Sequence, residues 1–142
     1  MEKREAAFTT KLEKWLLYNC KFEAFKLEVK CGVDNKPFNF NSGFKPHQLP
    51  TLIKIQDGPF VFKHSDAARL GTPYDLEFSC KCRAAVVMHW VRRGNKKFYF
   101  INPKHLLAYI EDGHKSITED VAAKLATHTG ELGLANITQI ML

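Results

Sequence analysis

The six residues Phe25-Lys26-Leu27-Glu28-Val29-Lys30 alternate apolar and charged side chains with a period of two. This alternation is typical of a half-buried β-strand, in which the apolar side chains face a core and the charged ones share the opposite face. A carboxylate and an ammonium two residues apart on a rigid strand can hold a metal ion and neutralise charge on a phosphate. The alternative interpretation is an ordinary solvated strand face.

Helical and strand patterns alternate along the rest of the chain, which we expect to form one domain over residues 1–142. Helical spacing, prolines in first turns and the cap residue Thr118 predict helices over 4–19, 46–58, 103–111 and 118–127. Apolar runs predict strands over 22–31 (ended by Gly32), 59–64, 74–82, 84–91 and 98–102, with a tight turn at Gly94-Asn95. The order predicts an α/β fold with a mixed central sheet flanked by helices.

The composition is that of an ordinary globular domain, with 45% hydrophobic and 25% charged residues. No apolar run approaches the roughly 20 residues of a membrane span. The charged start, residues 1–5, lacks the apolar segment of a signal peptide. We therefore expect no membrane partner and a cytoplasmic protein, including the case of a phage or mobile-element protein that acts in a host cell.

Two other kinds of site are less favoured by the sequence. Cys80 and Cys82, with Cys20 and Cys31, invite a zinc interpretation, but metal fingers generally use Cys-x₂-Cys pairs. The size and the apparent core of the chain do not require disulfides, so we expect reduced thiols. The chain also lacks a glycine-rich phosphate loop and a nucleophile elbow, so we expect no nucleotide cofactor.

The charge balance favours a polyanionic partner, with nucleic acid first. Lysine and arginine number 21 against 15 acidic residues, which gives a net charge of +6. Two groups of cations stand out in the sequence. The expected hairpin tip carries Arg92, Arg93, Lys96 and Lys97. The first helix carries Lys3, Arg4, Lys11 and Lys14. We expect DNA contacts from the tip, and the alternative is a solvated charged surface.

Several short patterns recur together in one order. They are Leu27-Glu28-Val29-Lys30, His47-Gln48-Leu49, Ala85-Val86-Val87-Met88, Phe98-Tyr99-Phe100-Ile101 and Lys115-Ser116-Ile117. In this combination, which spans most of 27–117, the chain resembles the PD-(D/E)xK nuclease superfamily, and within it the RecU-type Holliday-junction resolvases and related phage nucleases. One departure is that no Asp precedes the Glu-x-Lys strand. The family's turn is matched later, at Thr72-Pro73-Tyr74-Asp75.

The resemblance implies a restriction-endonuclease-like core, with the Asp hairpin displaced along the sequence. It implies a Mg²⁺ site, with Mn²⁺ as a substitute, whose ligands are Glu28, Asp75 and the carbonyl of Val29. Lys30 would orient the attacking water or stabilise negative charge.

The remaining site residues are also implied by the resemblance. The family places a glutamate of the first helix near the metal, for which Glu5 is preferred and Glu13 is second. Gln48 would join the catalytic group, and His47 would open a helix that holds a phosphate. Asp66 and Glu77 are weighed as further acidic residues below Asp75.

The implied function is a metal-dependent, structure-selective DNA endonuclease, in particular a Holliday-junction resolvase that acts as a homodimer on branched or duplex DNA. One alternative is a repair or restriction-type nuclease of the same fold that cuts duplex or flap DNA. Another is a catalytically silent basic DNA-binding module.

Overall fold

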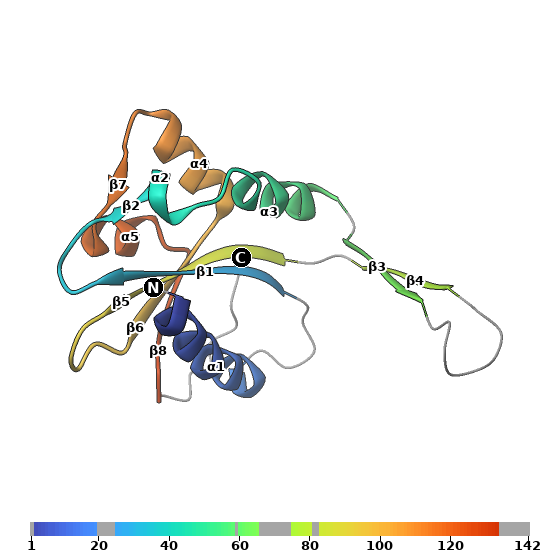
Figure 1. Cartoon of the computed structure of the whole chain (residues 1–142), viewed down its shortest axis with the longest axis horizontal. Coiled ribbons are helices and arrows are strands. Elements are labelled where there is room, and N and C mark those ends of the chain that lie inside the picture. The colour runs from blue at the N-terminus through green and yellow to red at the C-terminus, as the bar shows by residue number, and fades with distance from the viewer. Residues whose placement is uncertain (1, 20–24, 59, 66–74, 81–82, 134–142) are drawn as a thin grey trace.

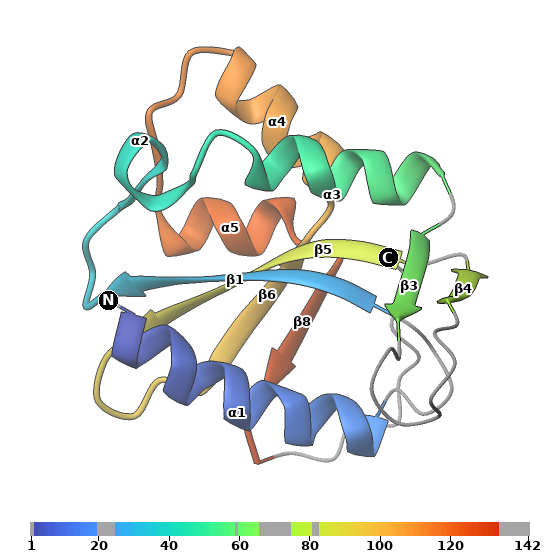
Figure 2. The same ribbon diagram turned by 45° about the vertical axis from the view of Figure 1, so that its right-hand side comes forward.

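The computed structural model has a central sheet with helices on both faces (Figures 1 and 2). It describes residues 2–19, 25–58, 60–65, 75–80 and 83–133, and the side chains of 3–15, 26–58 and 83–133. The four strands of the sheet are, in spatial order, β1 (Phe25–Val33), β5 (Arg83–Val91), β6 (Lys97–Ile101) and β8 (His128–Glu131). β1 and β5 are parallel and the other pairs are antiparallel, which confirms the mixed α/β sheet.

One helix, α1 (Glu2–Asn19), covers one face of this sheet. Its buried side chains Phe8, Leu12 and Trp15 recur every three or four residues and therefore share one side of the helix. They pack on Cys31 of β1 and on alternate residues of β5 and β6. The amphipathic helix predicted over 4–19 is confirmed.

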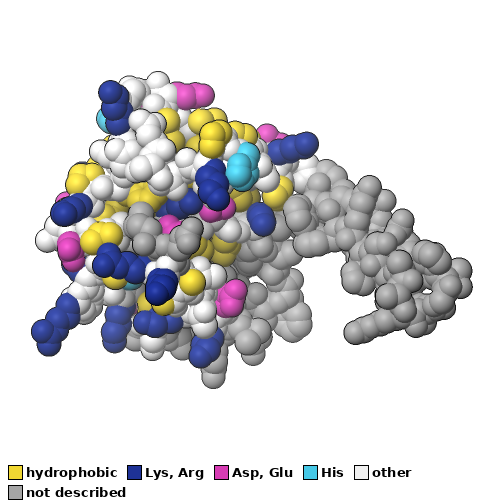
Figure 3. Space-filling view, viewed as in Figure 1, with side chains coloured by type: hydrophobic (Ala, Val, Ile, Leu, Met, Phe, Trp, Pro, Cys, Tyr) yellow, Lys and Arg dark blue, Asp and Glu magenta, His cyan; other side chains and the backbone are white. Residues whose placement is uncertain are grey.

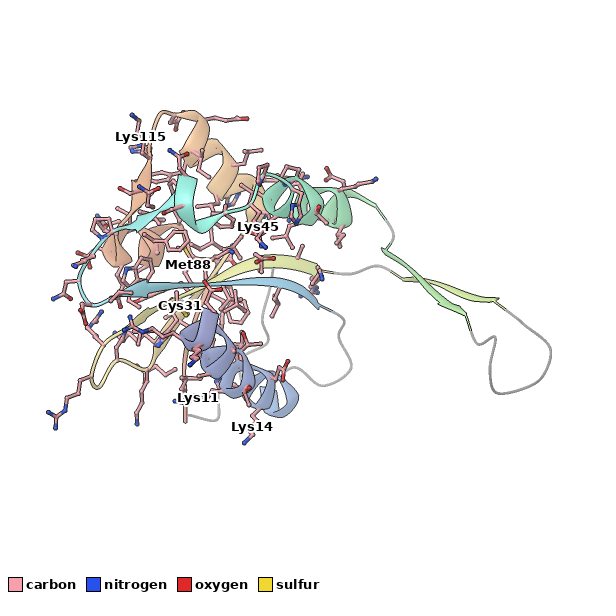
Figure 4. The ribbon with its side chains drawn as sticks, in the orientation of Figure 1. Lys11, Lys14, Cys31, Lys45, Met88 and Lys115 are labelled. Atoms are coloured by element: carbon pink, nitrogen blue, oxygen red, sulfur yellow. The ribbon has the colours of Figure 1, made fainter. Side chains whose placement is uncertain are left out.

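The other face is covered by α2 (Phe40–Gly43), α3 (Gln48–Asp57), α4 (Pro103–Glu111) and α5 (Glu119–Leu125). The odd residues of β5 face α1 and the even ones face these four helices, because successive side chains of a strand point to opposite faces. In Figure 4, Cys31 and Met88 accordingly lie on the two sides of the sheet. With both faces covered, the core residues 84–90 of β5 are all buried, as a sheet-centre strand requires.

The predicted cap Thr118 is confirmed, since its side-chain oxygen accepts from Val121 at the start of α5. Asn102, predicted as the end of a strand, instead caps α4 by accepting from Lys104, and the helix predicted from Pro46 begins at Gln48. Pro50 lies in the first turn of α3, where its missing N–H has no helical partner to lose.

Gly32 does not end the first strand, which continues to Val33. Gly32 pairs with Trp90 in the register of β1 and β5, and a β-carbon at Gly32 would lie 2.3 Å from the indole Nε1. The glycine therefore leaves room for a buried indole, which donates to the carbonyl of Lys36 at 3.0 Å. The turn between β5 and β6 also differs by one residue from the prediction. Its central residues are Arg93 and Gly94, and Gly94 has the positive φ of +81° that favours glycine.

Two small sheets lie outside the central one. β3 (Phe60–Ser65) and β4 (Asp75–Cys80) form an antiparallel hairpin, which Figure 1 shows leading away from the central sheet. β2 (Phe38–Asn39) and β7 (Ser116–Ile117) form the other, which the sequence did not predict. Among the described residues, no helix combines the length and the apolar character needed to span a membrane.

Candidate functional site

Three of the predicted site residues lie together on the face of β1 that α3 covers. The amide Nε2 of Gln48 donates to Oε1 of Glu28 at 2.8 Å. The ammonium of Lys30 lies 3.3 Å from the same oxygen and 5.2 Å from the centre of the Phe44 ring. The Lys30 side chain is 8% exposed and that of Glu28 is 25% exposed. A nearly buried cation thus supports a carboxylate that still reaches the surface.

The start of α3 fixes the direction of the Gln48 amide. The side-chain Oε1 of Gln48 accepts from the backbone N–H of Lys45 at 2.9 Å, and the backbone N–H of Gln48 donates to the carbonyl of Lys45 at 3.1 Å. Since an amide oxygen can only accept and its NH₂ can only donate, Nε2 must point toward Glu28. This backward bond to a residue three positions earlier resembles half of a capping box. The spacing of three residues between Lys45 and Gln48 could have indicated this bond from the sequence. Nothing in the sequence indicates the contact of the Phe44 ring with Lys30.

The cluster fits a hard cation in part. Both described contacts of Glu28 use Oε1 and neither uses Oε2, so one carboxylate oxygen is left to face a ligand. Mg²⁺ in phosphate-processing sites is held by one or two carboxylates together with substrate oxygens and water. Among the described residues, no group of three or more His, Cys, Asp or Glu side chains is placed to hold a metal. Among the three residues of this cluster, Glu28, Lys30 and Gln48, only Glu28 carries a carboxylate.

The backbone of Asp75 lies at the outer end of the β3–β4 hairpin. It pairs there with Ser65, whereas Phe60 and Cys80 pair at the end that connects to the rest of the chain. At about 3.3 Å per residue, five residues place Asp75 roughly 17 Å out along the hairpin. Its side chain and that of Glu77 lie outside the described side chains, and Asp66 lies outside the described residues. The pairing of Asp75 with Glu28 stays a prediction.

Val29 and the two helix glutamates belong to the opposite face of β1. The side chain of Val29 packs with the α1 core, so only its carbonyl is a candidate ligand. Glu5 lies close enough to the buried Cys31 thiol to act on its pKa, which places it on the α1 side of the sheet. Glu13 is exposed on the same helix. The structure thus brings neither glutamate to Glu28.

His47 precedes α3 and is exposed, and its side chain makes no capping hydrogen bond. Its carbonyl accepts from the backbone and the hydroxyl of Thr51. The imidazole therefore adds no structural bond among the described residues, and its predicted phosphate contact is untested.

The basic hairpin tip is present, but one of its four cations is already paired. Both terminal nitrogens of Arg92 donate hydrogen bonds to the carboxylate of Glu119, the first residue of α5. The Tyr99 hydroxyl donates to the same carboxylate at 2.9 Å. Burial acts to raise the pKa of Glu119, but these bonds outweigh it and hold the pKa below its usual value. Arg93, Lys96 and Lys97 are exposed.

Cys31 is free and buried. Burial, with a smaller contribution from Glu5, raises the pKa of its thiol to about 12, so it is protonated and unreactive at neutral pH. The side chains of Cys20, Cys80 and Cys82 lie outside the described side chains.

No family model, curated protein or solved structure matches the chain.

Proposed function

We propose that the chain is a metal-dependent DNA endonuclease with a restriction-endonuclease-like core, whose reaction centre is built on Glu28 and Lys30. The observation that supports this proposal is the ammonium of Lys30, held 3.3 Å from a partly exposed carboxylate that Gln48 orients. A purely solvated strand face would leave Lys30 in water, whereas its side chain is 8% exposed. Keeping a cation out of water is unfavourable unless a partner or a function compensates.

Each residue of the cluster has a defined task in this proposal. A Mg²⁺ ion, when bound, polarises the phosphate and lowers the pKa of its water. Glu28 would hold that ion through Oε2, with phosphate oxygens and waters as further ligands. Lys30 would stabilise the negative charge that develops on the phosphate oxygens. Gln48 is a positioning residue, because its bond to Oε1 fixes the rotation of the Glu28 carboxylate.

The substrate in this proposal is branched DNA, and the protein is a two-fold homodimer of the Holliday-junction resolvase type. Cutting two symmetry-related strands of a junction requires two copies of one site. The net charge of +6 supports a nucleic-acid substrate but selects no DNA shape.

Cleavage assays on four-way junction, flap, duplex and single-stranded DNA, in Mg²⁺ and in Mn²⁺, test the proposal. Glu28→Gln and Lys30→Met should each lower turnover by at least about 100-fold, because each removes a charge that acts in the transition state. Glu111→Gln is the matched control, since it neutralises an exposed glutamate of α4. Asp75→Asn tests the second carboxylate, and unchanged turnover would remove Asp75 from the ligand set.

Wild-type turnover in Glu28→Gln would overturn the proposed centre. Cutting of linear duplex as fast as of junctions would favour a repair or restriction-type nuclease. A catalytically silent DNA-binding module is the second candidate function, and the single described carboxylate of the cluster favours it. Tight DNA binding with no product in either metal would establish that candidate.

A further inference from the structure

A stacked pair of rings lies at the end of α4. The rings of Tyr109 and His114 have centroids 3.9 Å apart and planes 4° from parallel. The helix ends at Asp112 and Gly113, and the chain turns there so that His114 lies over Tyr109. The imidazole is exposed, and among the described residues it contacts no other ring and makes no hydrogen bond. One of its two faces is therefore free to receive a planar ligand.

The stack is supported by α2 and β7, which makes it an ordered platform. Tyr109 packs edge-on against the buried Phe40, with ring centroids 6.1 Å apart. The backbone N–H of Phe40 donates to the carbonyl of Lys115 at 3.0 Å, and Ser116 follows as the first residue of β7. The residue after His114 is thus hydrogen-bonded to α2. A ring that is already ordered loses little conformational entropy when a ligand stacks on it.

A line of aromatic contacts joins this platform to the cluster around Lys30 on the same side of the sheet. The Phe40 ring lies 6.4 Å from the Phe44 ring, and the Phe44 ring lies 5.2 Å from the ammonium of Lys30. Phe44 and Tyr109 are half-buried, so each presents part of its surface to solvent. A strand bound at the cluster can therefore continue over these side chains to the platform.

Each end of this aromatic line is next to an exposed lysine. Lys45 follows Phe44, and Lys115 follows His114. Within the described part of the chain, neither ammonium forms an ion pair. Figure 4 shows both lysines on the side of the sheet that carries α2 and α4. Figure 3 shows lysine and arginine side chains beside hydrophobic ones on this end of the molecule, where Figure 1 places α2, α4 and β7.

The local chemistry indicates the class of ligand. Glu111 and Asp112 precede the platform and are exposed, so the turn itself gathers no positive charge for a phosphate backbone. Its distinctive feature is a free aromatic face, which suits a nucleobase, because proteins hold single strands by stacking bases on exposed His, Tyr, Phe or Trp rings. The bases of a duplex are already stacked on one another, whereas an unpaired base offers a free face. The platform therefore favours unpaired nucleotides.

We propose that the Tyr109–His114 stack binds the base of an unpaired nucleotide, with neighbouring phosphates on Lys45 and Lys115. This inference rests on the proposed function in one respect, which is that the ligand is a nucleic acid. It requires neither a bound metal nor a cut. Flaps and opened branch points of DNA supply such nucleotides.

The first test compares two single strands that carry the same phosphates. One is a labelled oligothymidylate of about 12 nucleotides, and the other is an abasic strand of equal length, each followed by fluorescence anisotropy in EDTA. We call the ratio of the two affinities the base preference. The wild-type protein should bind the oligothymidylate at least about fivefold more tightly, because stacking adds affinity that phosphates alone do not supply. Equal affinities for the two strands would overturn the proposal.

Ring variants at the platform locate the stacking. His114→Leu should abolish the base preference, because leucine still covers Tyr109 but has no flat aromatic face. His114→Phe keeps a ring without the imidazole nitrogens, so its base preference should stay within about twofold of wild type. His105→Leu is the matched control, since it removes an exposed histidine from the same helix. An unchanged base preference in His114→Leu, or an equal loss in His114→Phe, would overturn the proposal.

The two lysines are tested by the salt dependence of binding. Lys45→Ala/Lys115→Ala should flatten the slope of log affinity against log salt by about 1.4, because two phosphate contacts are lost. Lys54→Ala/Lys124→Ala is the matched control, since it removes two exposed lysines from α3 and α5. Equal changes of slope in the two variants would overturn the proposed path of the strand.

Failure of this inference differs from failure of the nuclease proposal. Base preference in EDTA with no cutting in Mg²⁺ or Mn²⁺ would support the platform and contradict the nuclease. Cutting by a wild-type protein that binds both strands equally would support the nuclease and overturn the platform.

Discussion

Lys30 shows how one residue links the packing of this protein to its candidate chemistry. Its aliphatic stem is buried beneath α3, while its ammonium reaches the Glu28 carboxylate and the face of the Phe44 ring. Long charged side chains are rarely this buried without partners. The alternation in β1 predicted the face on which Lys30 lies but did not predict that a helix covers it.

His89 gives the stability of the protein a dependence on pH. Its Nδ1 lies 2.8 Å from the carbonyl of Lys97, and because a carbonyl can only accept, Nδ1 carries the proton. Burial lowers the pKa of His89 below its ordinary value of 6.5, more than this bond raises it. Just below that value, the unfolded chain therefore binds more protons than the folded protein does. The contribution of His89 to the free energy of unfolding should be fully present above about pH 6.5 and fall as pH drops through the lower pKa of the folded state.

Urea denaturation at about pH 7.5 and about pH 5 measures this effect. His89→Gln should reduce the difference in the free energy of unfolding between the two pH values, and the half-buried His128, whose pKa is lowered in the same direction, should account for a remaining part. His105→Gln is the control, since His105 is exposed on α4. The assignment to His89 is wrong if both variants keep the wild-type pH dependence.

At the scale of elements, Glu119 joins the start of α5 to the β5–β6 hairpin. It accepts from Arg92 of the hairpin and from Tyr99 of β6, and its position in the first helical turn also suits the helix dipole. Glu119→Ala should lower the free energy of unfolding by about 1–3 kcal/mol, because the buried Tyr99 hydroxyl loses its partner. Asp120→Ala removes the neighbouring, exposed acid of the same turn and should change it by less than about 0.5 kcal/mol. Urea denaturation compares the two variants, and equal losses would show that the link adds nothing beyond helix charge.

The elements were largely predictable because their signals are local. Pro103 and the cap Asn102 set the start of α4, and the continuous apolar run of β5 predicted a buried strand. The pairing of β2 with β7 was missed, because each strand has two residues and their contact joins distant parts of the chain. Gly32 was misinterpreted because its reason for being glycine is Trp90 on the neighbouring strand.

At the scale of the whole molecule, the sheet separates two surfaces. The Glu28 cluster and the Tyr109–His114 stack lie on the side of α2–α5, while a groove lined by cations lies beside α1. The cations of that groove are Arg4, Lys11, Lys14, Arg92 and Lys96. Lys11→Ala/Lys14→Ala should leave the base preference within about twofold of wild type, because lost charge acts on both strands alike.

Glu28→Gln should lose cleavage and keep the base preference in EDTA within about twofold of wild type, for the same reason. Anisotropy and cleavage kinetics on the same protein preparations measure both quantities. A large loss of the base preference in Glu28→Gln would show that the cluster and the stack do not act independently.

The sequence by itself determined the helices α1, α3, α4 and α5, most of the strands, the mixed α/β class and the Glu-x-Lys pattern of β1, because periodicity, caps and turn residues act over a few positions. Only the tertiary structure decided which distant side chains meet. Gln48 lies 20 residues from Glu28, and Arg92 lies 27 residues from Glu119. The tertiary structure also joined the two predicted basic segments into one groove and set Glu5 on the far side of the sheet from Glu28. Such meetings depend on how whole elements pack, and packing is a property of the complete core rather than of any short segment.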